Sequence, residues 1–164
     1  ITQELRKSLE KIYPATRLGV FKEITHNIAK LEEHLIEEKP QKVLVHRKGA
    51  CRLDGKRRAL IPGSMGTSSF VVKSNNSKAT ALALKSVAHG AGRVMGRREA
   101  KRSISAEQHR HSLGQVRVVS GSSANLLDES PLAYKKIDQV IDSLIKTDLA
   151  QPVLRLQPLA VLKG

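Results

Sequence analysis

Two stretches near the start of the chain show the hydrophobic spacing of amphipathic helices. Residues 2–12 predict a helix that Pro14 ends, because the residue before a proline avoids the helical region. Its apolar face consists of Leu5, Leu9 and Ile12. Residues 22–38 predict a second such helix, or a turn followed by one, with an apolar stripe of Ile24, Ile28, Leu31 and Leu35. Lys39-Pro40 is expected to end it.

Short apolar runs bounded by turn residues predict strands in the middle of the chain. The predicted strands are 42–45, 59–61, 69–73 and 115–120, with a polar, basic loop over 51–58. Residues 79–88 are rich in Ala and Leu and fit either a strand or a helix. Helices are predicted over 93–103 and 134–144, with Asp128 as a cap, and residues 153–161 are expected to be extended. The pattern predicts an α+β fold with a mixed sheet and helices.

Composition narrows the range of partners. The chain has 164 residues, which suits one modest domain or a piece of a larger one. Hydrophobic residues make up 40% and aromatic residues 2%, so the core is expected to be aliphatic. The scarcity of aromatic residues argues against binding single strands by stacking bases. A net charge of +14 favours polyanions such as RNA.

The remaining sequence-wide features concern the compartment. Cys51 is the single cysteine, which excludes an intramolecular disulfide and suits a reducing cytoplasm. No apolar run approaches the roughly 18 residues that a membrane span needs, and no signal-peptide pattern is present. The chain begins with Ile1, as a fragment would, although a chain trimmed from a tag would begin in the same way.

The segment with most chemical content is HGAGR at residues 89–93. Glycines let the backbone approach a ligand closely, and Arg93 offers a planar fork of donors suited to phosphate. An imidazole such as His89 can attack a phosphorus or carbonyl centre. Taken alone, the short motif fits a buried or surface histidine beside a glycine-rich turn better than a nucleophile.

A second segment, Ile61 to Phe70, contains PGSMGT, with two glycines and four hydroxyl side chains in ten residues. Backbone N–H groups of such a loop can form a concave anion site, to which Ser and Thr add donors. A plain hairpin turn would explain Pro62-Gly63 but not the cluster of hydroxyls. The sequence therefore indicates a phosphate- or nucleotide-binding loop.

These two motifs occur in order with Thr25-His26-Asn27, His46-Arg47-Lys48-Gly49-Ala50 and a terminal Lys163-Gly164. The series resembles the C-terminal half of RtcB-type RNA-splicing ligases, from about Thr25 to Gly164. The resemblance implies that residues 1–164 form the guanylate-binding part of a larger single domain. An apolar face of the chain would then pack against a missing N-terminal half.

The resemblance also implies a reaction. Ligases of this family join RNA 3′-phosphate or 2′,3′-cyclic phosphate ends to 5′-hydroxyl ends, in tRNA splicing or RNA repair, using GTP and Mn²⁺. His89 matches the histidine that forms a covalent histidine–GMP intermediate. A rival interpretation is a basic RNA-binding fragment without catalysis, which rests on the same charge of +14.

Individual residues take roles by the same resemblance. His26 matches a Mn²⁺ ligand. The residues implied to contact the guanylate are His26, Asn27, Pro62, Gly63, Ser64, Met65, Ser69, His89, Gly90, Ala91, Gly92, Arg93, Tyr134 and Lys163. Tyr134 lies in ESPLAYK, which resembles the family's E-x-P-x-A-Y-K, and otherwise fits a helix-surface aromatic; Lys163 otherwise fits a frayed tail. Arg47 and Lys48 fit either contacts to RNA phosphates or a basic turn.

The sequence departs from the family pattern at several positions, which limits how far the family's residue roles apply here. The cysteine, aspartate and two further histidines that complete the family's metal site are not recognisable here, and Cys51 is in the wrong place to replace the cysteine. The 164 residues alone are therefore expected to have an incomplete metal site and to be inactive. Val87-Ala88 stands where the family usually has Cys or Ser before HGAGR. His34, His109 and His111 are expected to be solvated.

Overall fold

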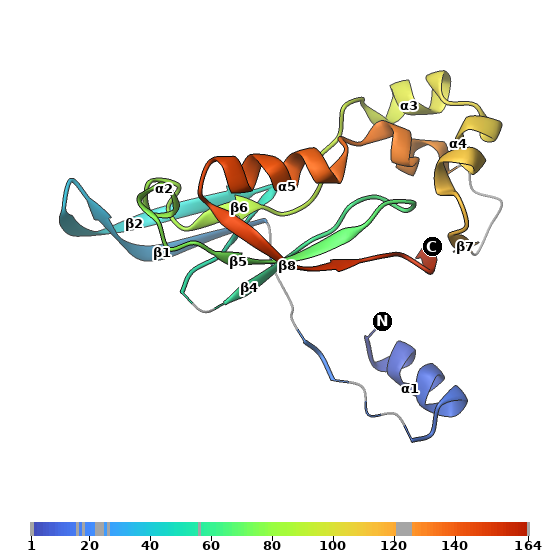
Figure 1. Cartoon of the computed structure of the whole chain (residues 1–164), viewed down its shortest axis with the longest axis horizontal. Helices are drawn as coiled ribbons and strands as arrows, with labels where there is room; N and C mark the ends of the chain where they lie inside the picture. Colours follow the sequence, from blue (N-terminus) through green and yellow to red (C-terminus); the bar gives the residue numbers. More distant parts are fainter. Residues whose placement is uncertain are drawn as a thin grey trace.

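The computed structural model describes residues 2–15, 17, 19–21, 25, 27–55, 57–120 and 126–163. Helix α1 (Thr2–Ile12) confirms the first predicted helix, and its Leu5 and Ile12 are exposed. Figure 1 shows this helix below the sheets. No helix in the described part of the chain is long and apolar enough to cross a membrane.

The helix predicted over 22–38 is wrong for the described residues from Asn27 onward. Strands β1 (Asn27–Ile36) and β2 (Lys39–Lys48) form an antiparallel hairpin in which Leu31 lies opposite Leu44. Glu37 and Glu38 both have positive φ, which two-residue hairpin turns require but which glutamate rarely adopts. Because the turn lacks Asn or Gly, the sequence gives no hairpin signal. The spacing of Leu31 and Leu35 suggested the buried stripe of a helix, but both side chains lie on the exposed face of the hairpin.

The other strands form three small sheets. Strands β4 (Arg58–Ile61), β5 (Ser69–Ser74) and β8 (Ala150–Leu156) make an antiparallel sheet in the order β4-β5-β8. Strand β3 (Ala50–Arg52) pairs antiparallel with β6 (Ser86–Ala88), and β7 (Arg117–Ser120) pairs parallel with β9 (Ala160–Lys163). The predicted strands are thus confirmed, with 42–45 lying inside β2. The described residues carry several small sheets where a single mixed sheet was predicted.

The structure settles the open stretch at 79–88 and corrects the start of the loop predicted over 51–58. Residues 79–88 contain both elements, helix α2 (Lys78–Leu82) and then β6, separated by Leu84 and Lys85 at positive φ. The predicted loop at 51–58 begins as β3, because Cys51 and Leu53 are completely buried in the core.

The helices of the C-terminal half are short. They are α3 (Arg97–Ser103), α4 (Ala106–Leu113), the 3₁₀ turns η1 (Leu126–Glu129) and η2 (Pro131–Ala133), and α5 (Ile137–Lys146). Serines cap two of them, Ser105 at α4 and Ser130 at η2. Helix α3 starts later than predicted because Arg93 pairs as a β-bridge with Tyr134. The predicted cap Asp128 lies inside η1, and Ser130 caps η2 instead.

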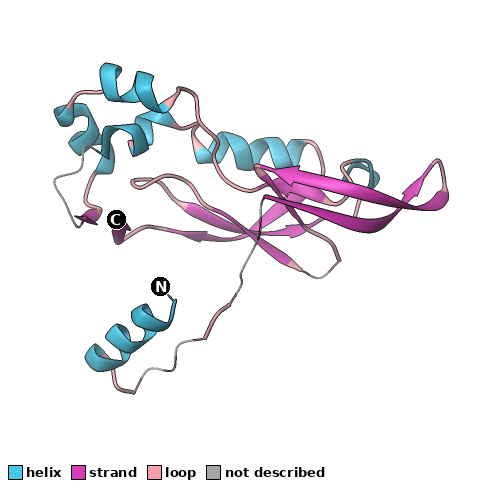
Figure 2. Cartoon of the chain, turned by 180° about the vertical axis from the view of Figure 1, so that it is seen from behind, coloured by secondary structure: helices cyan, strands magenta, loops and turns pink. Residues whose placement is uncertain are grey.

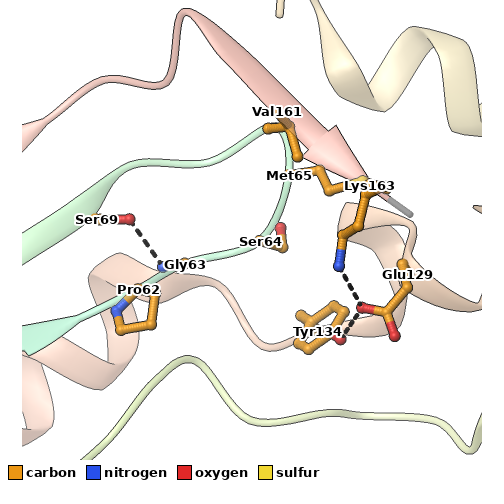
Figure 3. Close-up of a pocket in the computed structure, with 9 residues that line it drawn as sticks. All are labelled: Pro62, Gly63, Ser64, Met65, Ser69, Glu129, Tyr134, Val161 and Lys163. Carbon is orange, nitrogen blue, oxygen red and sulfur yellow. Dashed lines mark hydrogen bonds and ion pairs between the residues drawn. The ribbon is translucent and has the colours of Figure 1, made fainter. Parts of the chain in front are cut away.

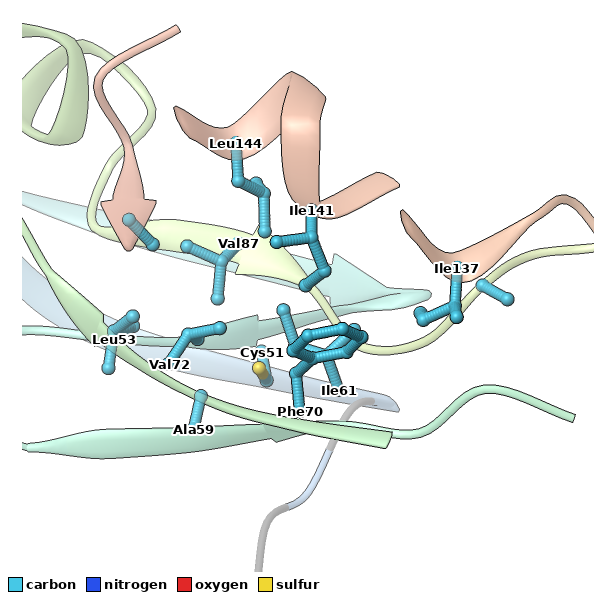
Figure 4. Close-up of a cluster of buried hydrophobic side chains, with 12 residues drawn as sticks. Cys51, Leu53, Ala59, Ile61, Phe70, Val72, Val87, Ile137, Ile141 and Leu144 are labelled. Carbon is cyan, nitrogen blue, oxygen red and sulfur yellow. The ribbon is translucent and has the colours of Figure 1, made fainter. Parts of the chain in front are cut away.

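The core lies between α5 and the sheets. Figure 4 shows Ile137, Ile141 and Leu144 of α5 pointing toward side chains of the strands below. The buried cluster comprises Cys51, Leu53, Ala59, Ile61, Phe70, Val72, Val87, Ala91, Ile137, Ile141, Leu144 and Ala150. Phe70 is its one aromatic member, so this core is aliphatic as the composition predicts.

Two apolar surfaces remain uncovered by described residues. Figure 2 shows the β1–β2 hairpin from behind. On one face of this hairpin Leu31, Leu35 and Leu44 are 67%, 67% and 58% exposed. On the β4-β5-β8 sheet a groove of about 460 Å³ is lined by Phe21, Arg58, Leu60, Val71, Val153, Leu154 and Leu156. The predicted apolar face is therefore present, and its partner stays a prediction.

Candidate functional site

A pocket of about 250 Å³ lies between the loop that follows β4, the turn η1 and strand β9 (Figure 3). Its lining residues are Pro62, Gly63, Ser64, Met65, Ser69, Glu129, Tyr134, Val161 and Lys163. All except Glu129 and Val161 belong to the set predicted from the sequence. The structure thus brings together residues that are separated by up to about a hundred positions in the chain.

The loop over PGSMGT is held by its own hydroxyl groups. The Ser64 N–H donates to Thr67 Oγ1 (2.7 Å), and the Gly63 N–H donates to Ser69 Oγ (3.4 Å). A Cβ at position 63 would collide with the Ser68 carbonyl oxygen and Thr67 Oγ1, so only glycine fits there. The cluster of hydroxyls therefore shapes the loop, and the N–H groups of Gly63 and Ser64 are engaged within it.

The HGAGR segment docks against three other motifs through backbone hydrogen bonds. The His89 N–H donates to Gly49 O (3.3 Å), and the Ala91 N–H donates to Pro62 O (3.1 Å). Downstream, the Lys135 N–H donates to Gly92 O (3.0 Å). A Cβ at Gly90 would lie 3.2 Å from Pro62 O, so this glycine serves the close packing of the segment. Gly92 has φ +71°, a backbone conformation that favours glycine. His89, half-buried, therefore stands at the junction of the conspicuous motifs but does not line the pocket.

The Arg93 side chain is engaged by protein groups. Its Nε donates to Met95 O (3.1 Å), Nη2 to Asp128 O (2.6 Å) and Nη1 to the Tyr134 hydroxyl (3.0 Å). The guanidinium also lies over the Tyr134 ring, 4.8 Å from its centroid. Arg93 thus ties HGAGR to the tyrosine, and direct contact with a nucleotide phosphate stays a prediction.

Tyr134 and Lys163 meet at Glu129. The Tyr134 hydroxyl donates to Glu129 Oε2 (2.8 Å), and Lys163 Nζ lies 3.6 Å from the same oxygen. Burial, reinforced by the hydrogen bond to Glu129, raises the pKa of Tyr134. Lys163 belongs to β9 and pairs with Ser120, so it is not a frayed end. Sequence reasoning missed Glu129 as a site residue, although it is the first position of the E-x-P-x-A-Y-K pattern.

The HRKGA motif contains a buried ion pair instead of a phosphate-binding arginine. Arg47 donates from Nη1 to Glu32 Oε1 (2.6 Å) and from Nη2 to Glu32 Oε2 (2.9 Å), and both side chains are at most 2% exposed. His34 Nε2 lies 2.9 Å from Glu32 Oε2, also buried. The hypothesis that Arg47 contacts RNA and the expectation that His34 is solvated are therefore wrong, whereas Lys48 is exposed.

This ion pair makes folding stability depend on acid pH. The hydrogen bond from Arg47 outweighs burial and, with His34 and Arg52, lowers the pKa of Glu32 to about 2. A carboxyl with a lowered folded-state pKa stabilises the fold above its ordinary pKa near 4.5 and loses that contribution as pH falls toward 2. We expect a loss of about 3 kcal/mol across this window.

Urea unfolding of wild type and Glu32→Gln between pH 7 and pH 2 measures this contribution. The stability gap between the two proteins should close as pH falls. The exposed neighbour Glu33 supplies the control, since Glu33→Gln should follow the wild-type profile. A gap that is independent of pH would contradict the assignment.

The predicted metal ligand, His26, lies outside the described residues. Asn27 is exposed at the start of β1, opposite Lys48, and does not line the pocket. Within the described part of the chain, no group of three or more His, Cys, Asp or Glu side chains is placed to hold a metal ion. Cys51 is completely buried in the core. The described residues therefore do not form a metal site by themselves.

His109 and His111, which were also expected to be solvated, differ in their exposure. His111 is exposed, as expected. His109 is half-buried, its Nδ1 is shielded without a hydrogen-bond partner, and burial lowers its pKa. The expectation that His109 is solvated therefore holds only in part.

Comparison with known proteins gives a consistent result. A model of the RtcB family, described as tRNA-splicing ligase RtcB, matches residues 1–164. The tRNA-splicing ligase RtcB of Nanoarchaeum equitans is 37% identical over 183 residues, covering 100% of this chain and 38% of that protein. The protein of the same name from Methanocaldococcus jannaschii is 35% identical, covering 100% of this chain and 19% of its own length. The RNA-splicing ligase RtcB of Mycobacterium tuberculosis is 38% identical, covering 91% and 37%.

The matched region includes every segment that builds the pocket, from Pro62 to Lys163. The chain spans less than two fifths of the length of these relatives. The family match nevertheless extends over the whole chain. The chain therefore belongs to the family of tRNA-splicing ligases RtcB.

Proposed function

We propose that this chain supplies the guanylate-binding part of a ligase that joins RNA 3′-phosphate or 2′,3′-cyclic phosphate ends to 5′-hydroxyl ends. The proposal covers tRNA splicing and RNA repair, with GTP as the activating nucleotide. The observation that carries it is the pocket, which gathers the motif residues Pro62 to Met65, Ser69, Tyr134 and Lys163 around one space. Family membership supports the reaction class.

The pocket suits one end of a guanine nucleotide. Its volume of about 250 Å³ is slightly below the range of about 300–1,000 Å³ that whole small ligands occupy, which leaves room for a nucleobase. An ammonium such as Lys163 is a donor suited to the O6 and N7 acceptors of guanine. The phosphates would then extend toward HGAGR, which is joined to the pocket loop through the Ala91–Pro62 hydrogen bond.

The proposed chemistry begins at His89. An imidazole nitrogen attacks the α-phosphorus of GTP, so that an N–P bond forms, the bond to the bridging oxygen breaks and pyrophosphate leaves. The guanylate then passes to the RNA 3′-phosphate as the N–P bond breaks and the imidazole is released, and the RNA 5′-hydroxyl displaces GMP as the new phosphodiester forms. A 2′,3′-cyclic phosphate enters this sequence after water opens it to the 3′-phosphate. His89 is suited to the first step because its backbone is fixed by the bond to Gly49 while its side chain is only half-buried.

Mn²⁺ belongs to the proposal only through parts of the protein beyond the described residues. His26 would be one ligand, and the remaining ligands would come from elsewhere in the intact protein. Those other parts of the intact protein would also cover the two apolar surfaces. One is the hairpin face with Leu31, Leu35 and Leu44, and the other is the groove on the β4-β5-β8 sheet. Exposed apolar area of this extent is typical of a surface that packs against other protein.

Helix α3 is proposed to face RNA. Its cations Arg97, Arg98, Lys101 and Arg102 are exposed, and η1, which α3 contacts, carries the pocket residue Glu129. We expect Arg98→Ala with Arg102→Ala to weaken RNA binding and to reduce its dependence on salt. Each lost phosphate contact should lower the slope of log affinity against log salt by roughly 0.7 to 0.9.

Filter-binding titrations of the intact protein at several salt concentrations measure that slope. A matched control is Arg6→Ala with Arg17→Ala, which also removes two positive charges, here from exposed positions in the N-terminal segment. Equal slopes for wild type and the α3 variant would refute the assignment of α3 to RNA.

Incubation of the intact protein with radiolabelled GTP and Mn²⁺, followed by a denaturing gel, tests the proposed function. Covalent label and ligation of RNA ends would support it. RNA binding without label would favour a non-catalytic RNA-binding module.

A further inference from the structure

Glu129 is the one acidic residue among the nine that line the pocket. It ends η1 and is followed by Ser130, which is completely buried and caps η2. The carboxylate is 20% exposed, so it is partly shielded from solvent. Its placement is therefore fixed by the backbone on both sides.

The two carboxylate oxygens face different partners. Oε2 accepts the Tyr134 hydroxyl (2.8 Å) and lies 3.6 Å from Lys163 Nζ, and both partners line the pocket. Oε1 lies 3.4 Å from Arg97 Nη2 and 3.9 Å from Arg93 Nη1. One carboxylate thus joins two pocket residues to two arginines outside the pocket lining.

This arrangement fixes the orientation of the two pocket partners. The Tyr134 hydroxyl accepts from Arg93 and donates to Glu129, so both its hydrogen-bonding directions are used. Lys163 has a flexible stem, and its ammonium is directed toward Glu129 in Figure 3. Holding such a side chain before the ligand arrives reduces the ordering that binding requires.

We propose that Glu129 is a positioning residue that holds Lys163 Nζ and the Tyr134 hydroxyl in place for the nucleotide. This inference rests on the proposed function, because the nucleotide is assigned there. Glu129 acts through its two partners, so its removal should weaken nucleotide binding more than the rate of the chemical step.

The first test measures covalent labelling of the intact protein as a function of GTP concentration. Glu129→Gln should raise the GTP concentration for half-maximal labelling roughly tenfold, the equivalent of one charged hydrogen bond, with little change in the maximal rate. Asp128→Asn is the matched control, because Asp128 pairs with Lys101 and does not line the pocket. It should behave as wild type.

Coupling to Lys163 separates positioning from general damage. Lys163→Ala should have a comparable effect alone, and Glu129→Gln combined with Lys163→Ala should be little worse than either single variant. An unchanged half-maximal concentration in Glu129→Gln, or a double variant whose effect equals the product of the single effects, would overturn the inference.

A second measurement does not depend on labelling by GTP. Acylation of lysines by an amine reagent, followed by mass spectrometry, should show Lys163 reacting severalfold faster in Glu129→Gln, because its Nζ is then no longer held against the Glu129 carboxylate. Asp128→Asn should instead accelerate Lys101. If wild type takes no label from GTP, the proposed function fails. Unchanged reactivity of Lys163 would independently overturn the positioning role.

Discussion

Replacement of His89 with alanine in the intact protein is expected to abolish covalent labelling by GTP and, with it, RNA ligation. The proposed reaction forms its N–P bond at this imidazole, and alanine offers no nucleophile. The fold should be preserved, because the backbone contacts of the segment, from the His89 N–H to Gly49 O and from the Ala91 N–H to Pro62 O, do not use the side chain. Labelling is measured on denaturing gels, and folding by thermal unfolding.

His111→Ala provides the matched control for this variant. His111 is exposed on α4 and lies outside the pocket lining, so its removal should leave labelling intact. Label that persists in His89→Ala at the wild-type level would show that another residue carries the guanylate. Loss of label together with loss of the folded state would call for His89→Asn, which retains a polar side chain of intermediate size.

Replacement of Arg47 with methionine is expected to destabilise the fold by about 3–5 kcal/mol, because it leaves the Glu32 carboxylate buried without its main partner. Arg47 also donates to Ser86 Oγ (2.9 Å) and Leu84 O (2.8 Å), which tie the β1–β2 hairpin to the turn before β6. Urea unfolding measures the loss.

An exposed ion pair gives the control for this prediction. Arg57 is 67% exposed and lies 3.4 Å from Asp54, so Arg57→Met should cost less than about 1 kcal/mol. Glu32→Leu combined with Arg47→Met should recover part of the stability lost in the single variant, since no buried carboxylate is then left without its arginine and Arg52 keeps its ion pair with Asp54. Equal losses for Arg47→Met and Arg57→Met would show that the buried pair has no special role.

Much of the secondary structure could be predicted where local pattern and tertiary packing agree. The strands predicted over 59–61 and 69–73 place Ala59, Ile61, Phe70 and Val72 in the core, and residues 137–146 form α5 with the predicted apolar face. The helix prediction over 22–38 failed because the hairpin buries two polar residues, Glu32 and His34, and exposes Leu31 and Leu35. No one-dimensional hydrophobic pattern indicates such an inverted face.

The candidate site was likewise predictable only in part. Motif resemblance predicted most of the pocket lining, because those segments keep a recognisable order along the chain. The roles of Arg47 and Arg93 could not be predicted, since a cation that binds phosphate and a cation that pairs inside the protein look alike in sequence. Burial of Glu32 and the position of Glu129 decide between these uses, and both depend on contacts between distant segments.

The central claim, that this segment carries a guanylate on HGAGR beside its pocket, is tested most directly by locating the adduct. The intact protein would be incubated with GTP and Mn²⁺, digested under basic conditions that preserve a phosphoramidate, and its peptides sequenced by mass spectrometry. The expected result is a guanylate on His89, in the peptide that contains HGAGR. A guanylate on any other residue, or unmodified His89 in protein that ligates RNA, would contradict it.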